Sequence, residues 1–151
     1  MIDFLDRVRE LVGPGHVLGS AASLVSYAID ATVGYRGEPL GVVFPGTADE
    51  TAAVVGLARA NGVTVVARGA GTSLAGGAVP PKGAIVVSLS RLRSGPFVDE
   101  ISRTVQVGAG VTTMEVQSAA RTAGLFYPPD PSSQDVATIG GNAATNAGGP
   151  H

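Results

Sequence analysis

The sequence predicts an α+β fold in which a βαβ unit at about residues 40–92 is followed by the start of a second α+β subdomain at about residues 97–151. Three observations support this. Short runs of β-branched and apolar residues at 42–44, 64–67 and 85–87 are typical of buried strands. Two Thr-x-x-Glu patterns are typical of helix N-termini. Glycine, which permits unusual backbone angles, is concentrated in two segments.

The N-terminal region is predicted to contain two short helices. Apolar residues recur at helical spacing over residues 2–12, and glycine and proline at 13–15 end this helix. Residues 21–29 are compatible with a second helix. Residues 31–39 are polar and contain glycine, so we expect a loop there.

The pattern that follows predicts a strand, a helix and a strand. Thr47 and Glu50 form a capping box, in which each side chain binds a free amide at the start of the helix, and the helix is expected over 48–60. The strands at 42–44 and 64–67 lie on either side of it. A βαβ unit with a right-handed crossover is therefore predicted.

The second subdomain is predicted to begin with a hairpin. Residues 97–101 and 104–108 have strand character and are separated by a two-residue turn. A second capping box, formed by Thr112 and Glu115, begins a helix that is expected to run to about Ala123.

Composition excludes several classes of protein. The chain has 151 residues, enough for one domain, and a formal net charge of −2, which argues against a nucleic-acid partner. It has no cysteine and two histidines, so neither a disulfide framework nor a metal site is expected. No apolar run approaches the roughly 18–20 residues of a transmembrane segment. A cytoplasmic globular protein is predicted.

The first glycine-rich segment, residues 68–80, directly follows a predicted strand. Gly69 and Gly71 match the start of the dinucleotide fingerprint G-x-G-x-x-G, but Leu74 stands at its third glycine position. Gly77 occupies the lysine position of the nucleoside-triphosphate loop, so that motif does not apply either. Consecutive amides in such a turn can bind an anion. The alternative is a connection between strands without a binding role.

The second glycine-rich segment, residues 127–149, is predicted to hold a short helix. Thr138 is a suitable N-cap, and Asn142 and Asn146 would then share one face of the helix. Gly140 and Gly141 at the helix start would leave bare amides exposed, which suits a phosphate or a polar ring edge. The alternative is a turn followed by a weak helix. Two such segments in one chain favour an extended ligand that contains a diphosphate.

Other polar residues are weaker candidates. Asp130, held between Pro129 and Pro131, can accept a hydrogen bond from a ligand. Arg36 and Arg68 can bind a carboxylate or a phosphate, but solvated or structural roles are equally compatible with the sequence. No Ser/His/Asp set and no pair of carboxylates at catalytic spacing is evident, so the catalytic residues stay unknown.

The strings RGAGTSLAGGAVP (68–80) and YPPDPSSQDVATIGGNAATNAGGPH (127–151) resemble the FAD-binding domain of the vanillyl-alcohol-oxidase / p-cresol-methylhydroxylase superfamily. Within it, the chain is most similar to the branch of the FAD-linked glycolate oxidase subunit and the D-lactate dehydrogenases. The resemblance extends from about residue 18 to residue 151. It implies the PCMH-type FAD-binding domain fold.

The resemblance also implies which residues bind FAD. Backbone amides of the first segment wrap the diphosphate, and the second segment lines the flavin and ribityl groups. The residues implied are Arg68, Gly69, Ala70, Gly71, Thr72, Ser73 and Leu74 in the first segment, and Pro129, Asp130, Ser133, Thr138, Gly140, Gly141, Asn142, Thr145, Asn146 and Gly148 in the second. Some family members bind FAD covalently through a histidine of the first segment. This chain has none there, so non-covalent FAD is expected.

The function implied is that of a flavin-dependent 2-hydroxy-acid dehydrogenase of the glycolate or D-lactate type, in which the substrate transfers a hydride to FAD. Other oxidase subunits are expected as partners, with a peripheral position at the inner face of the membrane. Family members continue into a substrate domain that is absent here, so the chain is expected to be a truncated N-terminal part, inactive alone. The alternatives are another FAD-linked oxidase of the superfamily or a stand-alone, non-catalytic nucleotide-binding module.

Overall fold

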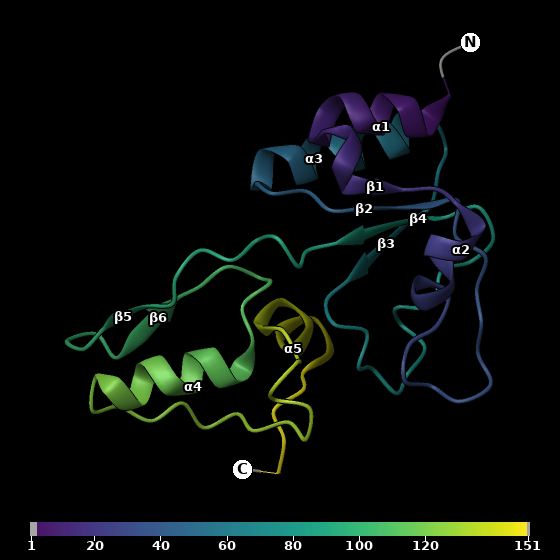
Figure 1. Cartoon of the computed structure of the whole chain (residues 1–151). Helices are drawn as coiled ribbons and strands as arrows, with labels where there is room; N and C mark the ends of the chain where they lie inside the picture. The colour runs from purple at the N-terminus through teal and green to yellow at the C-terminus, as the bar shows by residue number, and fades with distance from the viewer. Residues whose placement is uncertain (1–2, 151) are drawn as a thin grey trace.

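The computed structural model describes residues 3–150, which form two parts joined side by side (Figure 1). The N-terminal part contains helices α1 (Phe4–Val12), α2 (Ala21–Leu24) and α3 (Ala48–Ala60) and strands β1 (Val17–Leu18), β2 (Gly41–Val43), β3 (Val65–Arg68) and β4 (Ile85–Ser88). The C-terminal part contains strands β5 (Phe97–Asp99) and β6 (Thr104–Gln106) and helices α4 (Thr113–Thr122) and α5 (Ile139–Thr145). The mixed α+β architecture predicted from the sequence is confirmed.

The four strands of the N-terminal sheet lie in the order β1-β2-β4-β3. Strands β2 and β3 are both parallel to β4, and β4 lies between them, so Val86 pairs with Val42 on one side and with Val66 on the other. The predicted strand–helix–strand unit is present, with β2 and β3 in one sheet, but the sequence did not indicate that β4 lies between these two strands. The physical reason is burial. All four residues of β4 are buried, whereas β3 is only partly buried and occupies an edge.

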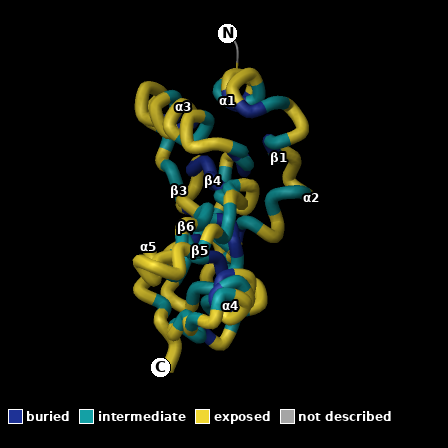
Figure 2. The backbone as a smooth tube through the Cα atoms, turned by 90° about the vertical axis from the view of Figure 1, so that its left-hand side faces the viewer, coloured by how far each residue is buried: buried dark blue, intermediate teal, exposed yellow. Residues whose placement is uncertain are grey.

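The core of this part lies between the sheet and helices α1 and α3 (Figures 1 and 2). Val8 of α1 and Val54 of α3 are fully buried against Ile85 and Val87, which point to the same face of β4 because side chains alternate along a strand. The predicted helix at 2–12 is confirmed from Phe4 onward, and Ile2 lies outside the described residues. This core makes the sheet a firm support for the loop that leaves the end of β3.

Strand β1 was not predicted. It has two residues, and Val17 pairs with Val43 of β2 in antiparallel orientation. Two residues are too few to show a periodic pattern, so this strand forms only because the edge of β2 offers it hydrogen bonds. The predicted helix over 21–29 is present as the single turn α2 followed by a 3-10 turn at Val25–Tyr27.

The two capping boxes differ. At α4 the box is complete: Thr112 accepts from the Glu115 amide, and Glu115 accepts from the Thr112 amide at 2.8 Å. At α3, Thr47 accepts from the Glu50 amide as predicted, but the Glu50 carboxylate accepts from the amide of Gly46 at 2.7 Å instead of from Thr47. The Glu50 carboxylate thus fixes Gly46, the residue before the N-cap, against the first turn of α3.

The C-terminal part is built around the hairpin and α4. Strands β5 and β6 pair in antiparallel register, with Val98 opposite Val105, so the hairpin is confirmed with shorter strands than predicted. The turn needs a left-handed residue, which is Arg103 at φ +55°. Helix α4 contacts β5, and α5 lies near the N-terminal end of α4 (Figure 1).

The capping box of α4 predicts a pH dependence of stability. The pKa of Glu115 lies below its ordinary value because the amide and then the hydroxyl of Thr112 bind the carboxylate, and because Arg93 lies beside it. Unfolding returns the pKa to about 4.3. The contribution is therefore present above that pH and is lost as the pH falls through the folded-state pKa. We expect Glu115→Gln to reduce the fall in Tm between about pH 5 and pH 3. Equal slopes for Glu115→Gln and for the exposed control Glu10→Gln would contradict this.

Candidate cofactor site

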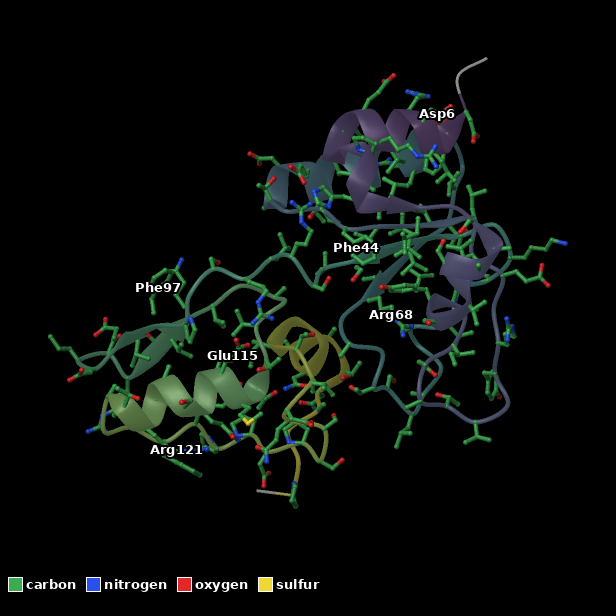
Figure 3. The ribbon with its side chains drawn as sticks, in the orientation of Figure 1. Asp6, Phe44, Arg68, Phe97, Glu115 and Arg121 are labelled. Atoms are coloured by element: carbon green, nitrogen blue, oxygen red, sulfur yellow. The ribbon has the colours of Figure 1, made fainter. Side chains whose placement is uncertain are left out.

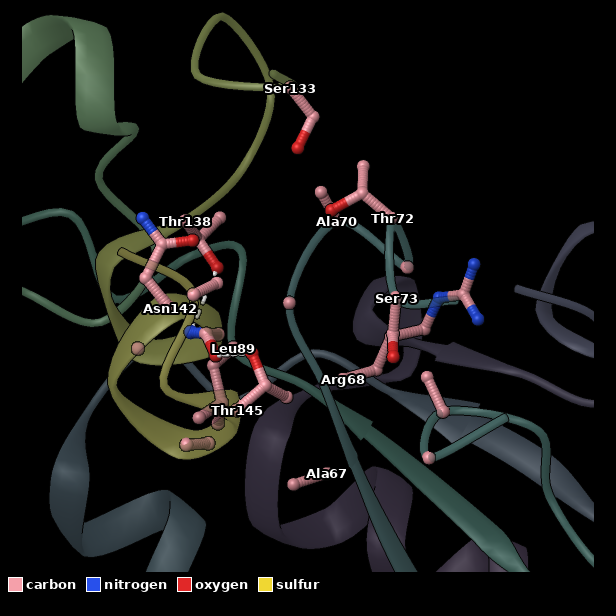
Figure 4. Close-up of a pocket in the computed structure, with 18 of the residues that line it drawn as sticks. Ala67, Arg68, Ala70, Thr72, Ser73, Leu89, Ser133, Thr138, Asn142 and Thr145 are labelled. Atoms are coloured by element: carbon pink, nitrogen blue, oxygen red, sulfur yellow. Dashed lines mark hydrogen bonds between the residues drawn. The ribbon is translucent and has the colours of Figure 1, made fainter. Parts of the chain in front are cut away.

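A cavity of about 860 Å³ lies where the two glycine-rich segments meet (Figure 4). The first segment leaves the end of β3 and forms one wall, and helix α5 together with residues 131–133 forms the other. Cavities that hold small molecules and cofactors have volumes of roughly 300–1,000 Å³. The size of this one is therefore suitable for a large cofactor.

Most of the predicted site residues line this cavity. Those that do are Arg68, Gly69, Ala70, Gly71, Thr72, Ser73 and Leu74 of the first segment and Ser133, Thr138, Gly140, Gly141, Asn142 and Thr145 of the second. The sequence missed several lining residues, among them Leu89, Ala109, Ala144 and Ala147. These are small or apolar residues, which no binding motif marks.

Four predicted residues do not line the cavity: Pro129, Asp130, Asn146 and Gly148. They belong to the backbone framework of the second segment. The amide of Asp130 donates to the carbonyl of Gly148 at 3.0 Å, and the Pro129 carbonyl accepts from the side chain of Gln117 in α4 at 2.9 Å. These contacts bring the two ends of the second segment together and anchor them to α4.

The amides of the first segment divide into two groups. Those of Ala75, Gly76 and Ala78 donate to side chains of the protein. Among the residues that the structure describes, the amides of residues 69–74 have no acceptor. Six successive amides at the wall of a cavity, in a turn where Gly71 has φ +76°, form a site suited to an anion.

Helix α5 confirms one expectation and corrects another. Thr138 is its N-cap and accepts from the Gly141 amide, as predicted. The amides at the helix start are not bare, however, because Gly140 donates to the carbonyl of Ala109 at 3.0 Å and Asn142 donates to the Thr138 carbonyl at 2.9 Å. The second segment therefore offers hydroxyl and amide side chains, and glycine surfaces, to a ligand.

The two asparagines of α5 do not share a helix face. Asn146 is the C-cap residue and has left-handed angles, with φ +53°. Asn142 donates from Nδ2 to the hydroxyl of Thr113 at 2.6 Å, and that hydroxyl donates to the Ala137 carbonyl at 3.2 Å. Thr113 is fully buried. Helix α4 thus fixes the position of α5, a role that the sequence did not reveal.

The side chain of Arg68 has a structural role. Its guanidinium donates to the carbonyl of Ile29 at 2.7 Å, lies 5.4 Å from the ring centroid of Tyr27, and packs against Gly71 (Figure 3). Burial lowers the pKa of Arg68, and Asp30 opposes that effect. Of the roles left open by the sequence, the structure therefore supports the structural one for Arg68. Arg36 is exposed and does not line the cavity.

The two glycine-rich segments approach each other very closely. A Cβ atom added to Gly69 would meet the hydroxyl oxygen of Thr138 and lie 3.7 Å from the Cα of Gly141. Of the described residues that line the cavity, Arg68 alone is ionisable. Within residues 3–150, no group of acidic residues and histidine could hold a metal ion. The described lining is thus made up mainly of glycine, alanine and hydroxyl side chains, which permit close approach of a ligand.

Comparison with protein families identifies the class. Residues 39–151 match the family described as FAD binding domain, and the chain belongs to that family. FAD is the cofactor. The structure fits this cofactor, because the cavity has the required size, its glycines allow close approach, and one wall has six amides available to a diphosphate.

Curated relatives show the resemblance to the 2-hydroxy-acid branch. The chain is 36% identical over 147 residues to the glycolate oxidase subunit GlcD of Bacillus subtilis (strain 168), covering 97% of this chain and 31% of the relative. It is 43% identical over 128 residues to the D-2-hydroxyglutarate dehydrogenase of Xanthomonas citri pv. viticola (strain LMG 965 / NCPPB 2475 / ICMP 3867 / CFBP 7660). This match covers 85% of this chain and 27% of the relative. The chain thus spans about a third of the length of these relatives.

Solved structures with the same fold include an alkyldihydroxyacetonephosphate synthase and a p-cresol methylhydroxylase. The first has a TM-score of 0.83 at 20% identity and covers 97% of this chain and 32% of the other. The second has a TM-score of 0.80 at 20% identity and covers 93% of this chain and 28% of the other. The predicted PCMH-type FAD-binding fold is confirmed. No helix within residues 3–150 has the length and apolar character that crossing a bilayer requires.

Proposed function

We propose that this chain is the FAD-binding portion of a flavin-dependent 2-hydroxy-acid dehydrogenase, an oxidoreductase that acts on a CH–OH group. Glycolate, D-lactate and D-2-hydroxyglutarate, the compounds in the names of its relatives, are all 2-hydroxy acids. Bound FAD supplies the electron-accepting ring, while the protein supplies binding and orientation.

The single observation that carries this proposal is the row of available amides at residues 69–74. In the proposed complex these amides bind the diphosphate of FAD. Ser133, the N-cap Thr138 and the α5 residues Gly140, Gly141, Asn142 and Thr145 would hold the flavin and ribityl groups. Pro129, Asp130, Asn146 and Gly148 hold the backbone of this second segment. The amides attract the two negative charges without the lysine that nucleoside-triphosphate loops use.

This chain's part in the reaction is to bind and orient the cofactor. Among residues 3–150, those that line the cavity include no carboxylate, histidine, lysine or tyrosine. We therefore propose that the group that takes the hydroxyl proton of the substrate lies outside this cavity. We expect residues 1–151 with FAD alone not to oxidise glycolate or D-lactate.

Cofactor retention after desalting, followed by acid precipitation, tests the proposal. We expect the FAD-loaded chain to stay yellow after desalting and to release all of its flavin on precipitation, since residues 68–80 contain no histidine for a covalent link. Riboflavin, which lacks the diphosphate, serves as the control and should bind at least ten times more weakly. Flavin in the pellet would show a covalent link. A chain that retains no FAD after desalting would contradict the proposed function.

Assembly with further oxidase subunits is also proposed, because two of the glycolate oxidase relatives are themselves named as subunits. The cytoplasmic location, with a peripheral position at the inner face of the membrane, stays a prediction.

A further inference from the structure

Three consecutive residues, 30–32, bind the first glycine-rich segment at several points. The amide of Ala31 donates to the carbonyl of Gly71 at 3.1 Å. The hydroxyl of Thr32 accepts from the amide of Gly76 at 2.8 Å and donates to the Ser73 carbonyl over a longer distance of 3.5 Å. One hydroxyl thus connects residues 73 and 76 of the loop.

Asp30 adds a contact at the far end of the same loop. Its carboxylate accepts from the amide of Ala78 at 3.4 Å and from the amide of Thr32 at 2.9 Å. Burial by itself would raise the pKa of Asp30, but these hydrogen bonds and the charge of Arg68 hold it below its ordinary value. Asp30 is therefore ionised at neutral pH, which strengthens its hydrogen bonds to the two amides.

The contacts with residues 30–32 separate the amides of the loop into those bonded within the protein and those available to a ligand. Residues 30–32 take up the amides of Gly76 and Ala78, and they leave those of residues 69–74 available. A glycine-rich loop loses much conformational freedom when it becomes ordered. A loop that is ordered before the ligand arrives avoids paying that entropy on binding, which increases affinity.

We propose that Asp30 and Thr32 are positioning residues, which hold the first glycine-rich segment in the conformation that presents amides 69–74 to the diphosphate of FAD. The inference rests on the proposed function. Neither residue lines the cavity, so both act through the loop and not through contact with the cofactor.

Amide hydrogen exchange in the FAD-free chain tests the contact itself. Thr32→Val removes the hydroxyl at nearly constant shape, and we expect the Gly76 amide to exchange at least ten times faster. Thr32→Ser keeps the hydroxyl and should exchange as the wild type does. Thr51→Val is the matched control, because the Thr51 hydroxyl binds only the Thr47 carbonyl within α3. A Gly76 amide that stays equally protected in Thr32→Val would overturn the inference.

FAD titration, followed by flavin fluorescence, tests the consequence. We expect Kd to rise about tenfold in Thr32→Val and to stay within about threefold of wild type in Thr32→Ser and Thr51→Val. Where Thr32→Val does not fold, Asp30→Asn replaces it, because asparagine cannot accept from both amides. Faster exchange without weaker binding would overturn the positioning role alone. A wild-type chain that binds no FAD would overturn the proposed function, and this inference with it.

Discussion

We expect Gly71→Val to weaken FAD binding at least tenfold. Gly71 has φ +76°, which a β-branched residue adopts only with strain of about 1–3 kcal/mol. Its Cβ would also meet the guanidinium of Arg68, so either the loop or the arginine must move. Arg68 is held by the Ile29 carbonyl and the ring of Tyr27, and movement of the loop displaces the amides that bind the diphosphate.

A matched control separates general backbone strain from an effect on the site. Gly62 also has a positive φ, +65°, but a Cβ there meets nothing within 4 Å, and Gly62 lies at the end of α3 away from the cavity. We expect Gly62→Val to lower stability and to leave FAD affinity unchanged. Equal FAD affinity in wild type and Gly71→Val would mean that the first segment is only a connection between strands.

Thr113→Val should lower the free energy of unfolding by about 1–3 kcal/mol. Thr113 is fully buried, accepts from Nδ2 of Asn142 and donates to the Ala137 carbonyl. Valine has nearly the same shape but no hydroxyl, so the Asn142 amide loses its acceptor in the partly buried interface. Urea unfolding measures the change. Because Thr113 connects α4 to α5, we also expect weaker FAD binding.

The control for this prediction is Thr122→Val. Thr122 lies in the same helix, and its exposed hydroxyl donates only to the Ser118 carbonyl at 3.0 Å. Its replacement should change stability by no more than about 0.5 kcal/mol. Similar losses in Thr113→Val and Thr122→Val would show that the buried network does not hold α5 in place.

Local signals explain which elements could be predicted. Helices α3 and α4 begin at the predicted threonine caps because the N-cap threonine and the amide that it binds lie within four residues of sequence. The order of the strands could not be predicted this way. The insertion of β4 between β2 and β3 depends on the burial of the whole sheet, and β1 is stabilised only by its pairing with β2.

The same distinction applies to the site. Glycine content located both walls of the cavity, since unusual backbone angles leave a mark in the sequence. The walls are held by Asp30, Thr32 and Thr113. No motif in the sequence distinguishes these residues from other aspartates and threonines. Thr32 binds Gly76 from 44 residues away, and Thr113 binds Asn142 from 29 residues away. No local pattern announces such contacts. The prediction of a bare amide at Gly140 was wrong for the same reason. The carbonyl of Ala109, which is distant in sequence, accepts a hydrogen bond from that amide.

The most direct test of the central claim is an FAD titration of the isotope-labelled chain, followed through its backbone amide resonances. The amides of residues 69–74 should shift in a saturable way, with further shifts along α5 and none in the hairpin β5–β6. Thr72 and Ser73 should be among the most affected, because they lie within the row of available amides. Saturable shifts that spare residues 69–74, or no saturable shift at all, would contradict the assignment of this cavity to FAD.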